Sequence, residues 1–131
     1  MAESAKAIIV TGALGGIGTE IVDFFRNKNW FVIAIDIRAR SHATAADLAG
    51  FDLDRLVQEP DYRNEKIEVI RSLLPPNLGR LVLVNNAAVQ KLGPTAELSK
   101  EDWDETLSIN VLAPFFLSQG LFEDLRDHDG L

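Results

Sequence analysis

The sequence contains no cysteine among its 131 residues. This absence excludes a disulfide framework, a thiolate metal cluster and a cysteine nucleophile, and it is typical of proteins that work in a reducing compartment. Histidine is almost as scarce, because only His42 and His128 occur, 86 positions apart. That spacing matches no metal-binding motif, so we expect both histidines in solvated loop or terminal segments and no metal site.

Basic residues are also few, since 13 Lys and Arg stand against 20 Asp and Glu, for a formal net charge of −7. Binding to nucleic acid or to an anionic membrane needs a basic footprint, so neither partner is expected. The most apolar stretch, Ile109 to Leu117, contains Asn110 and Pro114 and is far shorter than the roughly 20 residues of a membrane span. Residues 1–10 lack a signal-peptide pattern, which favours a cytoplasmic location.

What remains is the composition of a globular protein, with 47% hydrophobic and 25% charged residues. A chain of this length forms one domain, residues 1–131, with one core. Short apolar runs rich in β-branched residues alternate with segments of helical periodicity. The predicted strands are Ala7–Thr11, Trp30–Ile35 and Leu81–Val84, with a further short strand at either Ala45–Leu48 or Gly50–Leu53.

Helical segments are expected between these strands and after the last one. The first has an apolar face of Ile17, Ile21, Phe24 and Phe25, and the next, which ends before Pro75, has one of Ile67, Ile70, Leu73 and Leu74. The last begins with a capping box at Ser99–Asp102 and should kink or restart at Pro114. The alternation predicts an α/β fold with a doubly wound parallel sheet and helices on both faces. Ligands of such sheets bind at the carboxyl ends of the strands.

A glycine-rich segment, Thr11-Gly-Ala-Leu-Gly-Gly-Ile-Gly18, joins the first strand to the first helix. Glycines at such a junction permit the tight turn, let a pyrophosphate approach the backbone and allow close helix–strand packing. The phosphates would rest on the helix N-terminus. A purely structural turn is the alternative. Asp36 ends the second strand, 18 residues after Gly18, where it is either a ligand of an adenosine ribose or an ordinary strand-end aspartate.

Four patterns follow one another over residues 7–120. They are TGxxxGxG at Thr11–Gly18, Asp52-Leu53, Asn85-Asn-Ala-Ala88 with Ala88 in place of a glycine, and Asn110 within Ile109-Asn-Val111. Together they resemble the N-terminal half of the classical short-chain dehydrogenase/reductase family. The resemblance implies a Rossmann-type fold, truncated after the fourth strand and its following helix. It also implies an NAD(P)-dependent oxidoreductase that transfers hydride between nicotinamide and an alcohol or carbonyl substrate.

The resemblance further implies which residues bind the cofactor. They are Gly12, Leu14, Gly15, Gly16, Ile17 and Gly18 at the pyrophosphate, Asp36 at the ribose, Asp52 and Leu53 at the adenine, and Asn86 and Ala87 beside the fourth strand. Asp47 remains an alternative to Asp52 at the adenine. Asn110 is implied as a catalytic residue that holds a water in a proton relay; a buried asparagine bonded to local carbonyls is the alternative, because it falls on the apolar face of its helix.

The choice between the two nicotinamide cofactors depends on charge. An acidic Asp36 would repel a 2′-phosphate, and Gly15 is neither Lys nor Arg, so NAD(H) is favoured over NADP(H). Arg38 is the opposing observation, because it could turn towards a phosphate. We interpret it instead as a solvated loop charge.

The resemblance also implies a serine and a Tyr-x-x-x-Lys pair that handle the proton, and these would follow the last residue given. Tyr62-Arg-Asn-Glu-Lys66 matches the pair, but it precedes the fourth strand and we interpret it as coincidence. We therefore expect no turnover by these residues alone, and the alternative function is a noncatalytic dinucleotide-binding or interaction module. The fourth strand would be an exposed apolar edge, and the helix from Ser99 resembles one that contacts a second subunit, so a homo-oligomer is expected.

Overall fold

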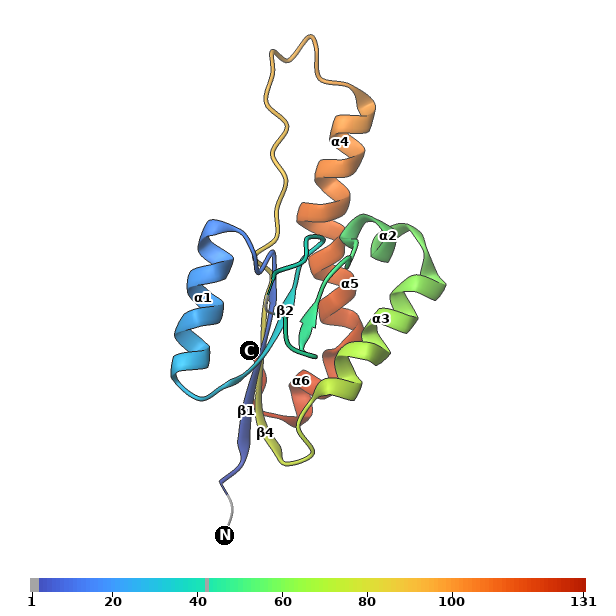
Figure 1. The fold of residues 1–131 in the computed structure, drawn as a ribbon. Helices are drawn as coiled ribbons and strands as arrows, with labels where there is room; N and C mark the ends of the chain where they lie inside the picture. The colour runs from blue at the N-terminus through green and yellow to red at the C-terminus, as the bar shows by residue number, and fades with distance from the viewer. Residues whose placement is uncertain (1–2, 42) are drawn as a thin grey trace.

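One sheet of four parallel strands forms the centre of the fold (Figure 1). The structure is a computed structural model that describes residues 3–41 and 43–131, so Met1, Ala2 and the prediction for His42 lie outside the described residues. The strands are β1 (Ala5–Thr11), β2 (Phe31–Ile35), β3 (Asp47–Leu48) and β4 (Leu78–Val84). Their order is β3-β2-β1-β4, so the chain leaves β3 and returns to the far side of β1. This order confirms the doubly wound parallel sheet.

Helices cover both faces of the sheet (Figure 1). They are α1 (Gly16–Asn27) on one face, and α2 (Leu53–Gln58), α3 (Pro60–Leu73) and α5 (Ala113–Gly120) on the other. The side chains of β1 alternate between the two layers, as a strand buried on both faces requires. Ile8 and Val10 pack in a cluster with Val22 of α1, while Ile9 packs in a second cluster with Ile70 of α3.

The third strand is short and follows the first of the two predicted positions. β3 comprises Asp47 and Leu48, which pair with Ala34 and Ile35 of β2. The alternative strand at Gly50–Leu53 is wrong, because these residues form a turn and a helix cap. Gly50 has a φ of +64°, and Oδ1 of Asp52 accepts hydrogen bonds from the N–H groups of Asp54 and Arg55 at the start of α2.

The last helical segment is interrupted, as the proline predicts. It consists of α4 (Lys100–Leu107), a π-helical turn η1 (Ser108–Leu112), α5, and α6 (Phe122–Asp127). The predicted capping box is confirmed, since Ser99 and Asp102 exchange hydrogen bonds at its start. Pro114 has no N–H to donate to the carbonyl of Asn110, and the wider π turn lies just before it. None of the described helices is long and apolar enough to span a membrane.

The outer edge of β4 is not bare. The N–H of Leu81 donates to the carbonyl of His128 at 3.0 Å, and the N–H of Leu83 donates to the carbonyl of Leu131 at 2.9 Å. Residues 128–131 therefore run beside β4 in the same direction. The expectation of an exposed apolar edge is wrong for Leu81, which is fully buried, because the segment after α6 folds back onto it.

Candidate functional site

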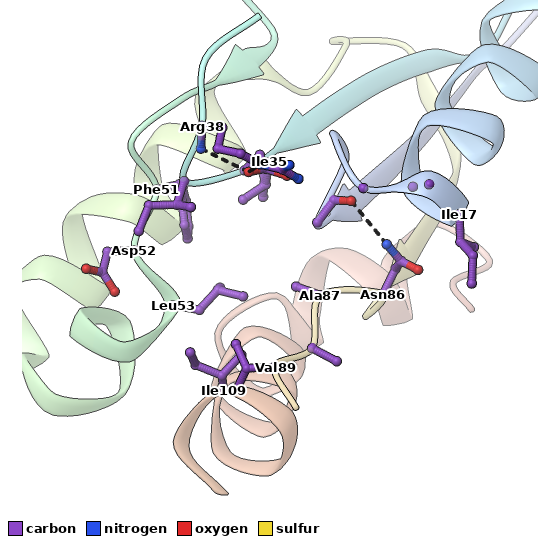
Figure 2. A pocket seen from close by; sticks show the side chains of 17 residues that line it. Ile17, Ile35, Arg38, Phe51, Asp52, Leu53, Asn86, Ala87, Val89 and Ile109 are labelled. Atoms are coloured by element: carbon purple, nitrogen blue, oxygen red, sulfur yellow. Dashed lines mark hydrogen bonds and ion pairs between the residues drawn. The ribbon is translucent and has the colours of Figure 1, made fainter. Parts of the chain in front are cut away.

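A cavity of about 500 Å³ opens at the carboxyl ends of β1, β2 and β4 (Figure 2). Most of the predicted cofactor-binding residues line it, namely Gly12, Gly15, Gly16, Ile17, Gly18, Asp36, Asp52, Leu53, Asn86 and Ala87. Sequence analysis did not assign five further apolar residues of the lining, which are Ile35, Ile37, Phe51, Val89 and Ile109. Only their position in the sequence could have indicated them, because each lies within one or two residues of a motif. The cavity thus joins polar groups at the strand ends to apolar walls, as small-molecule sites do.

The glycines of the β1–α1 turn have different roles in packing. Gly12 has a φ of +63°, a conformation that other residues rarely adopt. A Cβ on Gly18 would lie 2.0 Å from the carbonyl oxygen of Gly12, so only glycine fits where α1 crosses the turn. A Cβ on Gly16 would meet nothing within 4 Å, since this residue faces the open cavity at the N-terminus of α1. The turn is therefore both a structural junction and an accessible helix N-terminus, and the two interpretations of the motif are compatible.

Thr11 and Asn86 fasten the ends of β1 and β4 together. Oγ1 of Thr11, which is buried, accepts hydrogen bonds from the N–H groups of Asn86 at 3.1 Å and Ala87 at 3.0 Å. The side-chain amide of Asn86 donates to the carbonyl of Thr11 at 3.0 Å. It also donates to the carbonyl of Gly12 at 3.2 Å, the bond drawn in Figure 2. Sequence analysis did not identify this role of Thr11, because the bonds join residues 75 positions apart.

Asp36 directly follows the last residue of β2, and it is buried, with only 8% of the residue's surface exposed. Its Oδ2 accepts from the N–H of Leu14 at 2.9 Å, and its Oδ1 accepts from the backbone N–H of Arg38 at 2.9 Å. Burial by itself raises the pKa of Asp36, but hydrogen bonds from Arg38 and Leu14 outweigh it and hold the pKa below its usual value. The carboxylate is therefore ionised at neutral pH. Leu14 itself lines a small neighbouring depression instead of the main cavity.

Arg38 is a solvated loop charge, as predicted, and it is also paired with Asp36, which the sequence did not predict. Its guanidinium donates from Nε to Oδ1 of Asp36 at 3.1 Å and from Nη2 to Oδ2 at 3.3 Å. The side chain nevertheless remains 60% exposed, against 7% for its partner. Arg38 therefore adds a cation to the rim of the cavity and partly neutralises Asp36.

The opposite end of the cavity is formed by Phe51, Asp52 and Leu53. Figure 2 shows the side chain of Leu53 directed into the cavity, whereas Asp52 is turned towards the start of α2. The hydroxyl of Tyr62 accepts from the N–H of Asp52 at 2.8 Å and donates to the carbonyl of Gly50 at 3.4 Å. Tyr62 is buried and is occupied in holding this loop, which agrees with the interpretation of its match to Tyr-x-x-x-Lys as coincidence.

Of the two aspartates considered for the adenine, Asp52 lines the cavity and Asp47 lines the small neighbouring depression. The carboxylate of Asp47 accepts from Arg26 and from Thr44. Burial raises its pKa, but the hydrogen bonds from Thr44 and Arg26 lower it further than burial raises it. Asp47 thus stabilises the loop after β2.

Asn110 lies next to the cavity, one residue from Ile109 of its lining. Its side chain bonds both backbone groups of one residue, because Oδ1 accepts from the N–H of Val89 and Nδ2 donates to the carbonyl of Val89, each at 2.8 Å. Asn110 is exposed, so the alternative of a buried asparagine is wrong in its burial, although the amide does bond a backbone carbonyl. It also lines a second groove of about 210 Å³ between the β4–α4 loop and α4.

Metal ligands do not gather in the described part of the chain, where no group of three or more His, Asp and Glu side chains could hold an ion. His128 is half-buried, and its Nδ1 lies 2.7 Å from the carbonyl oxygen of Asp124. The polar groups of the cavity are therefore backbone amides, the carboxylates of Asp36 and Asp52, the Arg38 guanidinium and the amide of Asn86.

A sequence profile of short chain dehydrogenases matches residues 6–130, almost the whole chain. The chain belongs to the short-chain dehydrogenase family. The resemblance read from the glycine motif, Asp52-Leu53, Asn85–Ala88 and Asn110 is thereby confirmed.

Individual short-chain dehydrogenases agree with this assignment. The D-threitol dehydrogenase of Mycolicibacterium smegmatis is 33% identical over 131 residues, which cover 95% of this chain and 49% of that enzyme. The NAD-dependent glycerol dehydrogenase of Listeria innocua is 28% identical over 115 residues, covering 87% of this chain and 45% of that enzyme. The chain therefore spans about half the length of these curated relatives.

A solved short-chain dehydrogenase has the same fold. The crystal structure of an oxidoreductase from Brucella ovis, in complex with a partially ordered NAD, matches with a TM-score of 0.78 and 28% identity. The match covers 96% of this chain and 60% of that one. The present residues thus form the N-terminal half of a short-chain dehydrogenase fold, truncated relative to these proteins as the sequence predicted.

Proposed function

We propose that this chain is the cofactor-binding half of an NAD(H)-dependent short-chain dehydrogenase that acts on an alcohol or carbonyl substrate. The observation that carries the proposal is the ionised, buried Asp36 beside the open glycine turn of α1 in a single cavity of about 500 Å³. Family membership and the NAD-bound relative from Brucella ovis support a nicotinamide dinucleotide. The name of the NAD-dependent enzyme from Listeria innocua supports NAD(H) in particular.

The residues of the cavity fit such a cofactor. Gly16 leaves the N-terminus of α1 uncovered, and no acidic side chain lies in the first turn of that helix, so a pyrophosphate can accept its free N–H groups. Asp36 accepts hydrogen bonds from the adenosine ribose. Phe51 and Leu53 form apolar walls for the adenine, and Asp52 accepts from its amino group through Oδ2. The nicotinamide supplies the hydride donor or acceptor.

Asn86 and Ala87 hold the backbone at the end of β4, beside the position of the nicotinamide. Asn110 fixes the next turn of this backbone by bonding Val89, and it orders a water for proton transfer in the whole protein. The proton donor belongs to the whole protein, and the whole protein's substrate is an alcohol or carbonyl compound. A noncatalytic dinucleotide-binding module is the second candidate, favoured by the fact that these residues by themselves form a cavity of about 500 Å³.

Replacing Asp36 with alanine tests the cofactor assignment. The variant loses the acceptor for the ribose hydroxyls and the negative charge that repels a 2′-phosphate. We expect NAD affinity to fall roughly tenfold and the gap between NAD and NADP to narrow, as measured by isothermal titration calorimetry. Asp23→Ala, which removes an exposed carboxylate of α1 away from the cavity, is the control and should change neither affinity. An unchanged cofactor preference in Asp36→Ala would contradict the proposal.

We also propose that the protein forms a homo-oligomer through the helix after Ser99. Trp103, Leu107, Val111 and Phe115 recur every four residues along α4, η1 and α5, and each is between 47% and 58% exposed. Such a contiguous apolar stripe is more typical of an interface than of a monomer surface. We propose that the same stripe on a second copy of the chain packs against it in a symmetric interface.

Sedimentation velocity checks this assembly. The wild-type chain should associate at high micromolar concentration, and Phe115→Asp should shift it towards the monomer, because a carboxylate in an apolar interface loses its hydration. Leu92→Asp places the same charge on an 82% exposed loop residue off the stripe and should leave association unchanged. A monodisperse wild-type monomer, or equal effects of the two variants, would exclude this interface.

A further inference from the structure

The pair of Asp36 and Arg38 has a feature that the proposed cofactor does not explain. Each oxygen of the Asp36 carboxylate already accepts two hydrogen bonds within the chain. Oδ1 receives the backbone N–H and Nε of Arg38, at 2.9 and 3.1 Å. Oδ2 receives the N–H of Leu14 and Nη2 of Arg38, at 2.9 and 3.3 Å. A carboxylate offers about four lone-pair positions, so this one has none left for a ligand.

Two of these four donors are part of the backbone and two are not. The N–H groups of Leu14 and Arg38 belong to the backbone of the β1–α1 turn and of the loop after β2, so a ligand can leave both bonds in place. Nε and Nη2 of Arg38 sit on a side chain that is 60% exposed and free to rotate into solvent. Removal of the guanidinium frees one acceptor position on each oxygen, which is the pair that a ribose diol needs.

We propose that Arg38 is a displaceable internal ligand of the ribose subsite, so that its guanidinium competes with the cofactor's ribose hydroxyls for Asp36. This inference rests on the proposed binding of NAD(H) at Asp36. Arg38 thereby lowers the affinity for NAD(H). The released guanidinium stays at the rim of the same cavity, where it can pair with a 2′-phosphate, so Arg38 also reduces the discrimination against NADP(H).

The exchange is energetically feasible because an ion pair with one exposed partner contributes little net stability. The second arginine of this loop, Arg40, does not share the role. Its Nη1 lies 3.6 Å from Oδ1 of Asp47, and Arg26 contacts the same oxygen at 3.2 Å. Arg40 therefore belongs to a separate cluster that braces β3, and it provides a matched control.

The test is calorimetric titration of the 131-residue chain with NAD and, separately, NADP. Arg38→Ala keeps the backbone N–H and removes both guanidinium bonds. We expect NAD to bind roughly two- to fivefold more tightly and NADP several-fold more weakly, so that the gap between them widens by about tenfold. Arg40→Ala should leave both affinities within about twofold of wild type. Because the Arg38–Asp36 pair is exposed on one side, the gain in NAD affinity should shrink as salt is raised.

Outcomes of this titration separate the inference from the proposed function. If wild type binds NAD and Arg38→Ala binds it equally or more weakly, the competing role of Arg38 is overturned while the proposed function stands. If Arg40→Ala reproduces the gain, general loss of positive charge is the cause and the inference is again overturned. If wild type binds neither cofactor but remains folded by circular dichroism, both the proposed function and the role of Arg38 are wrong.

Discussion

Replacing Gly18 with alanine should prevent normal folding of the β1–α1 junction. The added Cβ would lie 2.0 Å from the carbonyl oxygen of Gly12 and 2.9 Å from its carbon, and both are backbone atoms that no side-chain rotation can move. Steric overlap of this kind typically costs about 1–3 kcal/mol, and the short backbone contact here favours the upper end. We expect the urea midpoint of unfolding to fall accordingly and NAD binding to become undetectable by calorimetry.

Gly16→Ala is the matched control for this prediction. It makes the same chemical change two residues away on the same helix, but the new Cβ meets nothing within 4 Å. Stability should therefore be unchanged or slightly higher, since alanine restricts the unfolded chain more than glycine does. NAD affinity should fall, because the methyl group enters the cavity. Equal losses of stability in both variants would show that the close contact at Gly18 is not what holds the turn.

Replacing Thr11 with valine should have the second-largest effect on stability. Valine has the same shape but removes the hydroxyl that accepts from the N–H groups of Asn86 and Ala87. The N–H of Asn86 keeps a second acceptor, the carbonyl of Val84 at 3.0 Å, so the main cost is the lost hydrogen bond of the Ala87 N–H. Ala87 is half-buried beside the cavity, where solvent can reach its N–H, so we expect a loss of about 1 kcal/mol in chemical denaturation.

Thr11→Ser keeps the hydroxyl and removes only a methyl group, so most of the stability lost in Thr11→Val should return. The two variants also differ in their effect on the site, because Ala87 lines the cavity. Thr11→Val should weaken NAD binding beyond what its lower stability explains at concentrations where it is fully folded. If serine and valine destabilise the chain equally, the methyl packing of Thr11 matters and its hydrogen bonds do not.

Much of the fold could be predicted because its elements carry strong local patterns. Ile8, Ile9 and Val10 form an apolar run that suits a strand buried on both faces, and β1 is buried there. Ser99 and Asp102 predicted the start of α4 through their spacing alone. β3 has only two residues, too few for periodicity to show, which is why its sequence pattern left two positions open.

The candidate site was predictable where a motif fixes the backbone and not where side chains meet across the fold. Glycines 12 and 18 were found by spacing, since their turn is local. The ion pair between Arg38 and Asp36 depends on the conformation of the loop after β2, which the periodicity of the sequence does not encode. Asn110 was predicted on an apolar helix face, and an apolar face usually packs against the core. Trp103, Leu107 and Val111 of that face are exposed in the structure, and Asn110 is exposed with them, which periodicity alone does not encode.

The bonds of Asn110 to Val89 have a consequence for chain entropy. They anchor one end of the segment that extends away from the sheet in Figure 1, and the Ser99 capping box anchors the other. Residues 92–97 between them are exposed. The entropy of closing a loop between fixed ends grows only logarithmically with its length, by about 0.6 kcal/mol for a doubling. Insertions at residues 92–97 should therefore leave the cavity and the folded state almost unaffected, so this segment can change in length at little cost in stability.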